Sequence, residues 1–159
     1  MFCLRILINM TNWAKIRVLF FFQERVTLVD RKRLKNFLSK ILERESHKTS
    51  GEVRVIFCSD EFLLQINKQY LNHDYYTDII TFPFSNESDD MIDAELYISV
   101  DRISENAKQL KTSIKTELHR VIFHGVLHLC GYGDKTKQEI ESIRKKEDTL
   151  LSKYFLRST

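Results

Sequence analysis

The fold is decided by the stretch from Phe123 to Asp134, which reads Phe-His-Gly-Val-Leu-His-Leu-Cys-Gly-Tyr-Gly-Asp. His124 and His128 stand four residues apart in an apolar segment that predicts a helix, so both imidazoles emerge on one face, one turn apart. Gly131 can take the left-handed conformation that ends a helix and reverses the chain, which brings Asp134 back toward the histidines. Two imidazoles and one carboxylate suit a zinc-like divalent ion and leave a fourth position open, as catalytic metal sites do.

Two other interpretations of this stretch remain open. Helix histidines can simply be satisfied by hydrogen bonds, although this suits a lone histidine better than a pair followed by glycine and a carboxylate at matching spacing. The pattern H-x-x-x-H-x-x-G-x-x-D also overlaps the metzincin protease signature, in which a glutamate directly after the first histidine is the general base. That position is Gly125 here, and glycine cannot accept a proton, so the peptidase interpretation lacks its main catalytic group.

The composition is that of a soluble globular protein. The chain has 159 residues, 30% charged and 43% hydrophobic, with one proline and four glycines, so it contains no low-complexity linker. Its net charge of +3 permits an acidic partner such as RNA without arguing for one. Three dispersed cysteines do not make a disulfide framework and indicate a reducing compartment, the cytoplasm. Cys130 turns away from the histidine face of its helix, which predicts a small core residue rather than a ligand.

The N-terminal segment differs from the rest of the chain. Its apolar run is broken by Arg5, and it has neither the longer apolar region nor the small-residue cleavage site of a secretory signal. It also has too few consecutive apolar residues for a transmembrane helix. We expect residues 1–17 to be a loosely attached extension, or the product of a start codon assigned too early, and residues 18–159 to form a single domain.

Hydrophobic periodicity predicts alternating strands and helices. Short apolar runs indicate strands at residues 18–22, 53–58, 78–84 and 95–99. Amphipathic repeats indicate helices at residues 31–45, 59–72, 101–111, 114–130 and 137–154. Asp30, Ser59 and Ser113 are expected to cap three of these helices, and Thr136 with Glu139 has capping-box spacing for the last. Elements in this order give an α+β or α/β layer fold.

The first predicted helix has a basic outer face. Its cationic residues are Arg31, Lys32, Arg33, Lys35 and Lys40. A face of this kind is usually only solvated, and contact with RNA phosphates is the alternative that its charge permits.

Three blocks of the sequence resemble the YbeY family, metal-dependent endoribonucleases associated with ribosomal RNA maturation, in a Bacteroidetes-like variant. Residues 66–70 are similar to the family's L-N-x-x-Y, residues 77–84 to T-D-V-L-S-F-P-F, and residues 124–134 to H-G-x-L-H-L-x-G-Y-x-H. With the order of elements, the likeness covers roughly residues 18–155. It implies an α+β fold in which a small mixed sheet of four strands packs with five helices and carries a zincin-like metal site on the central helix.

The sequence departs from the family pattern at two positions. The family's third ligand is commonly histidine, and here it is Asp134, which zinc also accepts. The family arginine thought to act in catalysis falls on Leu71, which can neither hold a phosphate nor stabilise its developing charge. Arg54, Lys68 or Arg120 are the candidates to replace that arginine in space.

The resemblance implies one Zn²⁺ per chain, held by His124, His128 and Asp134, with His124 the only candidate for a further catalytic role. The implied activity is a zinc-dependent endoribonuclease, a hydrolase specific for single-stranded RNA. It would act in 16S rRNA 3′-end maturation and ribosome quality control. The implied partner is the small ribosomal subunit, and the implied state is a cytoplasmic monomer without membrane contact.

Other residues and functions are left open by the sequence. Thr77, Asp78 and Thr81 either border the cleft or fix a turn and a sheet edge. His119 lies about 140° around the helix from His124 and is expected to be structural or to act only behind the ligands. A non-catalytic ribosome-assembly factor that retains a structural zinc, which Leu71 favours, is one alternative function. A metallopeptidase is the other.

Overall fold

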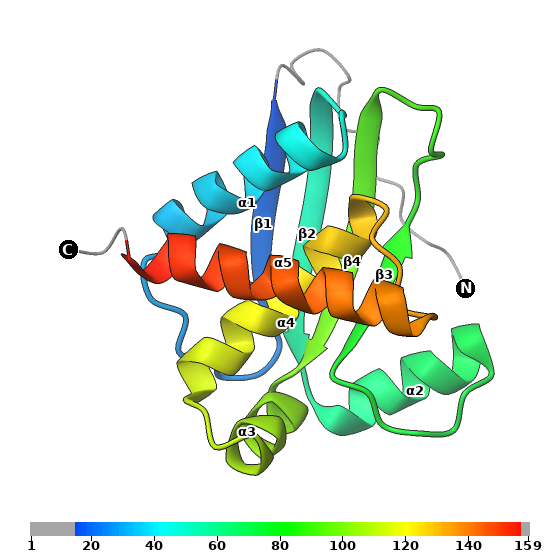
Figure 1. Cartoon of the computed structure of the whole chain (residues 1–159). Helices are drawn as coiled ribbons and strands as arrows, with labels where there is room; N and C mark the ends of the chain where they lie inside the picture. The colour runs from blue at the N-terminus through cyan, green and yellow to red at the C-terminus, as the bar shows by residue number, and fades with distance from the viewer. Residues whose placement is uncertain (1–14, 157–159) are drawn as a thin grey trace.

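The computed structural model describes residues 15–156 and shows a four-stranded mixed sheet (Figure 1). The strands are β1 (Ile16–Phe22), β2 (Ser50–Cys58), β3 (Ile79–Pro83) and β4 (Met91–Ser99). Their order is β1-β2-β4-β3, with β1, β2 and β4 parallel and β3 antiparallel to β4 at one edge. The α+β class and the small mixed sheet predicted from the sequence are confirmed.

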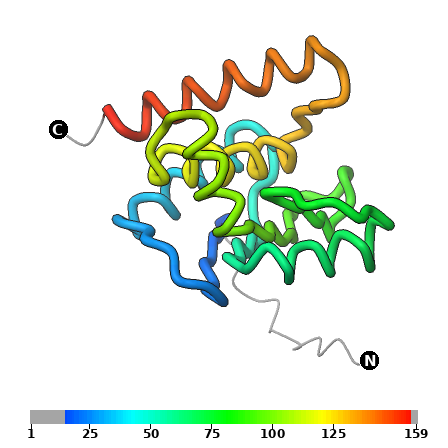
Figure 2. The backbone as a smooth tube through the Cα atoms, turned by 90° about the horizontal axis from the view of Figure 1, so that it is seen from below, coloured from blue at the N-terminus to red at the C-terminus, as the bar shows by residue number. Residues whose placement is uncertain are grey.

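Five helices in the described part of the chain surround this sheet, as predicted. They are α1 (Arg31–Glu45), α2 (Asp60–Leu71), α3 (Val100–Gln109), α4 (Ile114–Leu129) and α5 (Lys137–Leu156). α1 and α4 contact one face of the sheet, and α5 runs along the outer side of α4, as Figure 2 shows. α2 covers part of the other face, where Leu63 and Ile66 meet Cys58 and Ile80 in a second, smaller core.

Gly125 sets the distance between α4 and the sheet. A Cβ added at this position would stand 2.5 Å from Cδ1 of Ile79 and 3.2 Å from both terminal methyl carbons of Leu96. Leu96 is fully buried in the main core, so it has little room to move away. Glycine therefore lets α4 lie close to β3 and β4, and the glutamate that a metzincin needs here would displace these side chains.

Most of the predicted helix caps are confirmed. Ser59 accepts a hydrogen bond from the backbone N–H of Phe62, and Ser113 accepts one from Thr116. Thr136 and Glu139 form the reciprocal capping box, each side chain accepting from the other residue's backbone N–H.

The cap predicted at Asp30 is wrong. Asp30 lies in the left-handed region (φ 54°, ψ 47°) and makes no side-chain cap hydrogen bond. An N-cap residue normally has extended backbone, which turns its side chain toward the first helical N–H groups; left-handed backbone aims it elsewhere. α1 nevertheless begins at Arg31, as predicted.

The central strands are longer than their apolar runs. β2 begins at Ser50 and β4 at Met91, because the parallel pairing of the two strands continues through residues that precede the strands predicted at 53–58 and 95–99. Arg54 accounts for this on the polar face of the sheet: its guanidinium bonds to Glu52 and Glu95 at 3.0 Å each and also pairs with Asp93. This network neutralises the acidic side chains that the paired strands bring together, while Ile92 and Ala94 of the extended part of β4 are buried in the main core.

β1 begins at Ile16 rather than at Val18, and the Ile16 side chain is buried in the main core. Residues 1–14 of the expected extension lie outside the described residues. Among the helices of residues 15–156, none combines the length and the apolar character needed to cross a bilayer.

Candidate metal centre

α4 and the turn after it place the three predicted ligands. α4 ends at Leu129, and Gly131 follows with φ 89°, a backbone conformation that residues other than glycine rarely adopt. The backbone N–H of Gly131 donates to the His128 carbonyl at 3.0 Å, and that of Tyr132 donates to the Leu127 carbonyl at 3.1 Å. These two bonds reverse the chain and bring Asp134 beside the helix.

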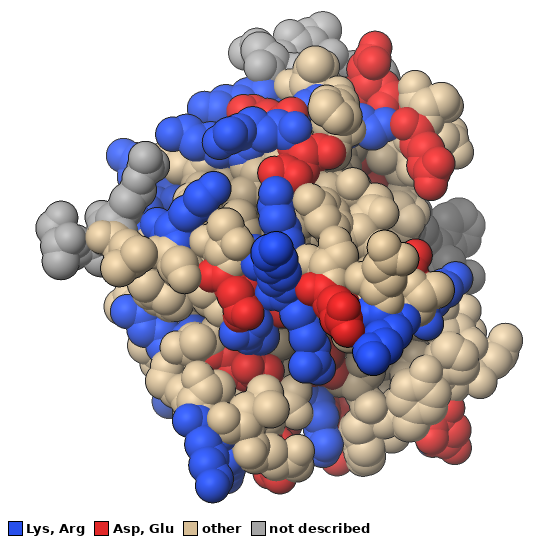
Figure 3. Space-filling model, viewed as in Figure 1, with Lys and Arg blue, Asp and Glu red and all other residues tan. Residues whose placement is uncertain are grey.

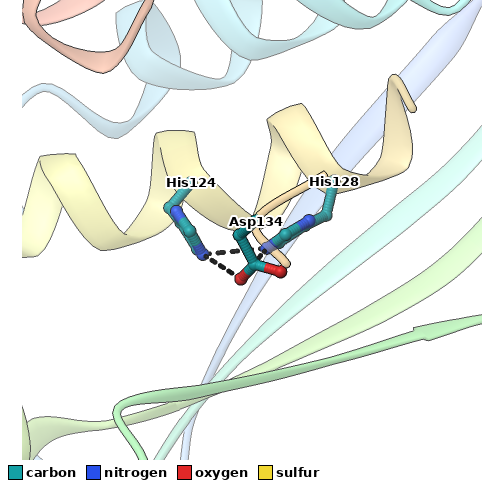
Figure 4. Close-up of side chains that lie close together, drawn as sticks. All are labelled: His124, His128 and Asp134. Atoms are coloured by element: carbon teal, nitrogen blue, oxygen red, sulfur yellow. Dashed lines mark hydrogen bonds and ion pairs between the residues drawn. The ribbon is translucent and has the colours of Figure 1, made fainter. Parts of the chain in front are cut away.

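The structure brings the side chains of His124, His128 and Asp134 together (Figure 4). The two Nε2 atoms are 2.8 Å apart, and Asp134 Oδ2 lies 3.3 Å from Nε2 of His128 and 3.8 Å from Nε2 of His124. Ligand atoms held at about 2.1 Å from a tetrahedral zinc ion are about 3.4 Å from one another. The three separations bracket that value, so these residues fit a divalent ion of this kind.

Both imidazoles are held with Nε2 toward the shared point. His128 Nδ1 lies 2.8 Å from the Tyr132 carbonyl, which can only accept, so this nitrogen carries the proton. His124 Nδ1 donates in the same way to Glu147 Oε1 at 2.7 Å. Glu147 is buried, and its second oxygen accepts from Arg120 at 3.2 Å. Such outer partners fix the tautomer and ring orientation of metal-binding histidines.

The electrostatics of the centre favour positive charge. Burial lowers the pKa of His124, but the hydrogen bond to Glu147 and the charges of Glu147, Asp78 and Asp134 outweigh it, so the net shift is upward. A site that draws a proton to His124 also attracts a cation, and an incoming ion must displace that proton.

Two hollows meet at the centre, since His124 and Asp134 line both. The smaller cavity, of about 740 Å³, is also lined by Asp78, Asn106, Glu117, Arg120, Arg144 and Glu147. The larger cleft, of about 1230 Å³, is lined by His128 and by residues of β3 and the loop before it. Thr77, Asp78 and Thr81 all border this larger cleft, which is one of the two roles that the sequence left open for them.

The candidate replacements for the family arginine lie in different places. Arg54 is on the polar face of the sheet, held by three carboxylates, and Lys68 pairs with Asp74 at 2.7 Å. Arg120 lines the smaller cavity, where its guanidinium pairs with Glu147 and Asp148. Leu71 itself lines the larger cleft and is 41% exposed.

His119 and Cys130 lie outside the three-residue group. His119 is buried; Nδ1 lies 2.7 Å from the Lys115 carbonyl, and its ring packs on Tyr154 and Phe155. Cys130 packs against the main core, and burial raises the pKa of its thiol to about 12. Both positions agree with the structural roles predicted for these residues.

Glu147 was not identified from the sequence. It comes from α5, and it lies in a run of charged residues that gives no functional signal by itself. The sequence does place Glu147 on the apolar face of its helix, because the buried residues of α5 are Ile143, Glu147, Leu150, Leu151 and Tyr154. An acid on the apolar stripe of an amphipathic helix needs a partner, and here the partners are His124 and Arg120.

Glu117 is a second buried acid near the centre. It lies on α4, two turns before His124, and is 3% exposed; its Oε2 has no hydrogen-bond partner among the described residues. Burial raises the pKa of Glu117, and the charges of Asp78 and Glu147 raise it further against the opposing effect of Arg120. The ionised form of Glu117 therefore costs stability.

We expect Glu117→Gln to raise the midpoint of thermal unfolding at about pH 8 by about 2–4 °C, which is about 1 kcal/mol for a chain of this size. A carboxyl group with a raised folded-state pKa destabilises the fold above that pKa and not below the unfolded pKa. The gain should therefore vanish toward about pH 4, near the unfolded pKa of glutamate. Circular dichroism melts across this range measure the gain. A loss of stability at high pH, or a difference independent of pH, contradicts the assignment.

Comparisons with known proteins agree with this architecture. A family model described as Endoribonuclease YbeY matches residues 21–155. An Endoribonuclease YbeY of Cytophaga hutchinsonii is 46% identical over 140 residues, 87% of this chain and 96% of that protein. The one from Bacteroides thetaiotaomicron is 50% identical over 105 residues, 66% of this chain and 75% of that protein. The solution structure of TM1509 from Thermotoga maritima has a TM-score of 0.57 at 26% identity and covers 89% of this chain and 90% of that one.

Fold and site together define an α+β protein whose central helix and following turn carry a group that could hold a metal. The chain belongs to the YbeY endoribonuclease family, as the three sequence blocks predicted.

Proposed function

We propose that the protein is a single-domain, zinc-dependent endoribonuclease that hydrolyses phosphodiester bonds in single-stranded RNA. The carrying observation is the convergence of His124, His128 and Asp134 on one point at the meeting of two hollows. Relatives at 42–50% identity bear the name of endoribonuclease. One Zn²⁺ per chain, held by these three residues, is the cofactor that the donor set suits.

The residues around the centre have separate roles in the proposed hydrolysis. A bound divalent ion supplies Lewis acidity and a water with its pKa lowered to about 7. Glu147 and the Tyr132 carbonyl keep the protons of the two imidazoles on Nδ1, away from the reacting side. Arg120 and Arg144 on one side and Lys135 on the other line the hollows, where cationic groups orient phosphates.

The finer proposal is that the substrate is the 3′ end of 16S rRNA on the small ribosomal subunit, in the cytoplasm, with the protein a monomer. Lys and Arg side chains gather over α1 and, interleaved with Asp and Glu, along α5 on the face shown in Figure 3; the basic part over α1 favours binding to a polyanion. Part of the α1 charge also serves packing, since Arg31 lies over the Phe22 ring and Arg33 over the Tyr154 ring.

Cleavage of an end-labelled, unpaired oligoribonucleotide tests the proposed activity. Zinc-loaded protein should cut it, and chelation or His124→Ala should abolish cutting. Equal cutting by wild type and His124→Ala would show that a contaminating nuclease is responsible and would refute the proposal.

A non-catalytic ribosome-assembly factor is the second candidate, because the larger cleft carries Leu71 where the family pattern has arginine. It predicts co-sedimentation with small ribosomal subunits without cleavage of RNA. The metallopeptidase has no comparable support, because the position of its general base is Gly125, packed against Ile79 and Leu96.

A further inference from the structure

An exposed aromatic pair stands at the rim of the larger cleft. Tyr75 and His73 both line the cleft, and Tyr75 is 56% exposed. Their rings are stacked, with centroids 5.0 Å apart and planes inclined by 22°, and the Tyr75 hydroxyl lies 3.0 Å from His73 Nδ1. The pair belongs to neither of the hydrophobic cores, so its flat apolar surface is open to a ligand.

A buried asparagine fixes the loop that carries this pair. Asn67 on α2 is 2% exposed, and its amide donates to the Tyr75 carbonyl at 2.9 Å. The backbone carbonyl of Asn67 accepts from the backbone N–H of His73 at 3.2 Å. Asn72, directly before His73, takes the left-handed conformation that ends α2. The rings are thus presented in a set position, which reduces the entropy lost when a ligand stacks on them.

The other groups of the cleft suit a nucleotide strand. His124, His128 and Asp134 lie in the same cleft as the aromatic pair, together with the cation of Lys135 and the apolar side chain of Leu71. An aromatic face, a cation and a candidate phosphodiester-cleaving centre in one cleft match the three parts of an unpaired nucleotide: base, phosphate and scissile bond. At about 1230 Å³ the cleft exceeds the roughly 300–1,000 Å³ of common small-molecule pockets, as a strand requires.

We propose that Tyr75, stacked on His73, is a platform for an unpaired base of the RNA that this cleft receives. This inference rests on the proposed function and adds to it a binding subsite and a physical basis for strand selection. In a duplex the faces of the bases are covered by their neighbours, so only an unpaired base can stack on Tyr75. Stacking is tolerant of sequence, because every base has a π face.

Binding without turnover tests the platform separately from catalysis. Fluorescence anisotropy of a labelled unpaired oligoribonucleotide is measured with full-length, chelator-treated protein. Tyr75→Ala should weaken binding by about 5- to 150-fold, the range for loss of one stacked base. Tyr75→Phe keeps the ring and should stay close to wild type. Tyr76→Ala is the matched control: Tyr76 is in the same loop and 47% exposed, but it lies against Arg102 outside the cleft.

The outcomes separate the platform from the nuclease. Wild-type binding by Tyr75→Ala, or an equal loss in Tyr75→Phe, overturns the platform, and so does an equal loss of binding to a blunt duplex. Thermal melts and zinc uptake of each variant exclude a folding defect. If binding depends on Tyr75 but the protein never cleaves RNA, the platform is supported and the nuclease proposal is refuted. If Tyr75→Ala changes neither cleavage nor binding, the platform is refuted and the nuclease proposal stands.

Discussion

Alanine at His128 or at Asp134 should leave the purified protein with less than about a tenth of the zinc that the wild type retains. Each substitution removes one of three converging ligand atoms, and two protein ligands hold an ion poorly. Removing a hydrogen-bond partner of a metal ligand weakens metal binding by up to about 100-fold, so we expect removal of a ligand itself to weaken zinc binding by more than that. Zinc per chain by elemental analysis, after dialysis against a weak chelator, gives the measurement.

Two further variants make this result specific. His47→Asn is the control: His47 is exposed and outside the group, and asparagine tolerates its positive φ of 59°. Asp134→His restores a ligand of the family's usual kind, so it should keep most of the zinc. Full zinc content in Asp134→Ala would place the third ligand elsewhere and would remove the basis of the hydrolytic proposal.

The centre could be predicted from the sequence because it is local. His124, His128 and Asp134 lie within one helix and one turn, so the period of the helix and the freedom of Gly131 were enough to bring them together. The same holds for the caps at Ser59 and Ser113, which need only the next helical turn. At Asp30 the prediction failed, because the preference of aspartate for N-cap positions does not reveal that its backbone here is left-handed.

The parts that escaped prediction depend on distant pairs. The start of β2 at Ser50 needs Met91 as its partner, and the nearby charge of Glu52 is neutralised by Arg17 and Arg54. That network places Arg54 on the sheet face away from the main core, so it cannot stand in for the family arginine at the centre. Tyr75 is informative only once the fold has put it in the same cleft as His124.

Glu147→Ala should weaken zinc binding by about 10- to 100-fold, although Glu147 lies outside the group of His124, His128 and Asp134. Alanine removes the acceptor that holds the His124 proton on Nδ1, so the ring can rotate or present the wrong nitrogen. Glu147→Gln keeps an acceptor oxygen and should lose less. The free zinc concentration at half-occupancy, set by a competing chelator, and the visible spectrum of the cobalt-substituted protein report affinity and ligand geometry without any turnover.

The pH dependence distinguishes the charge of Glu147 from its hydrogen bond. Burial lowers the pKa of His124, and the hydrogen bond and charge of Glu147 contribute most to the larger opposing rise. A proton on His124 competes with the ion, so zinc affinity falls as pH drops through that pKa. In Glu147→Gln the pKa is lower, and affinity should persist to lower pH than in the wild type. Superimposed pH profiles would show that the carboxylate charge does not act on His124.

Asp148→Asn is the matched control for both Glu147 variants. Asp148 is the next residue and pairs with the same Arg120 guanidinium at 2.7 Å, but its side chain is 65% exposed, and among the described residues it bonds to neither ligand histidine. If zinc affinity depended only on the charge around Arg120, the two positions would behave alike. Because Glu147 acts through His124, zinc binding should fall in Glu147→Ala and stay at the wild-type level in Asp148→Asn, with similar unfolding midpoints excluding a general loss of structure.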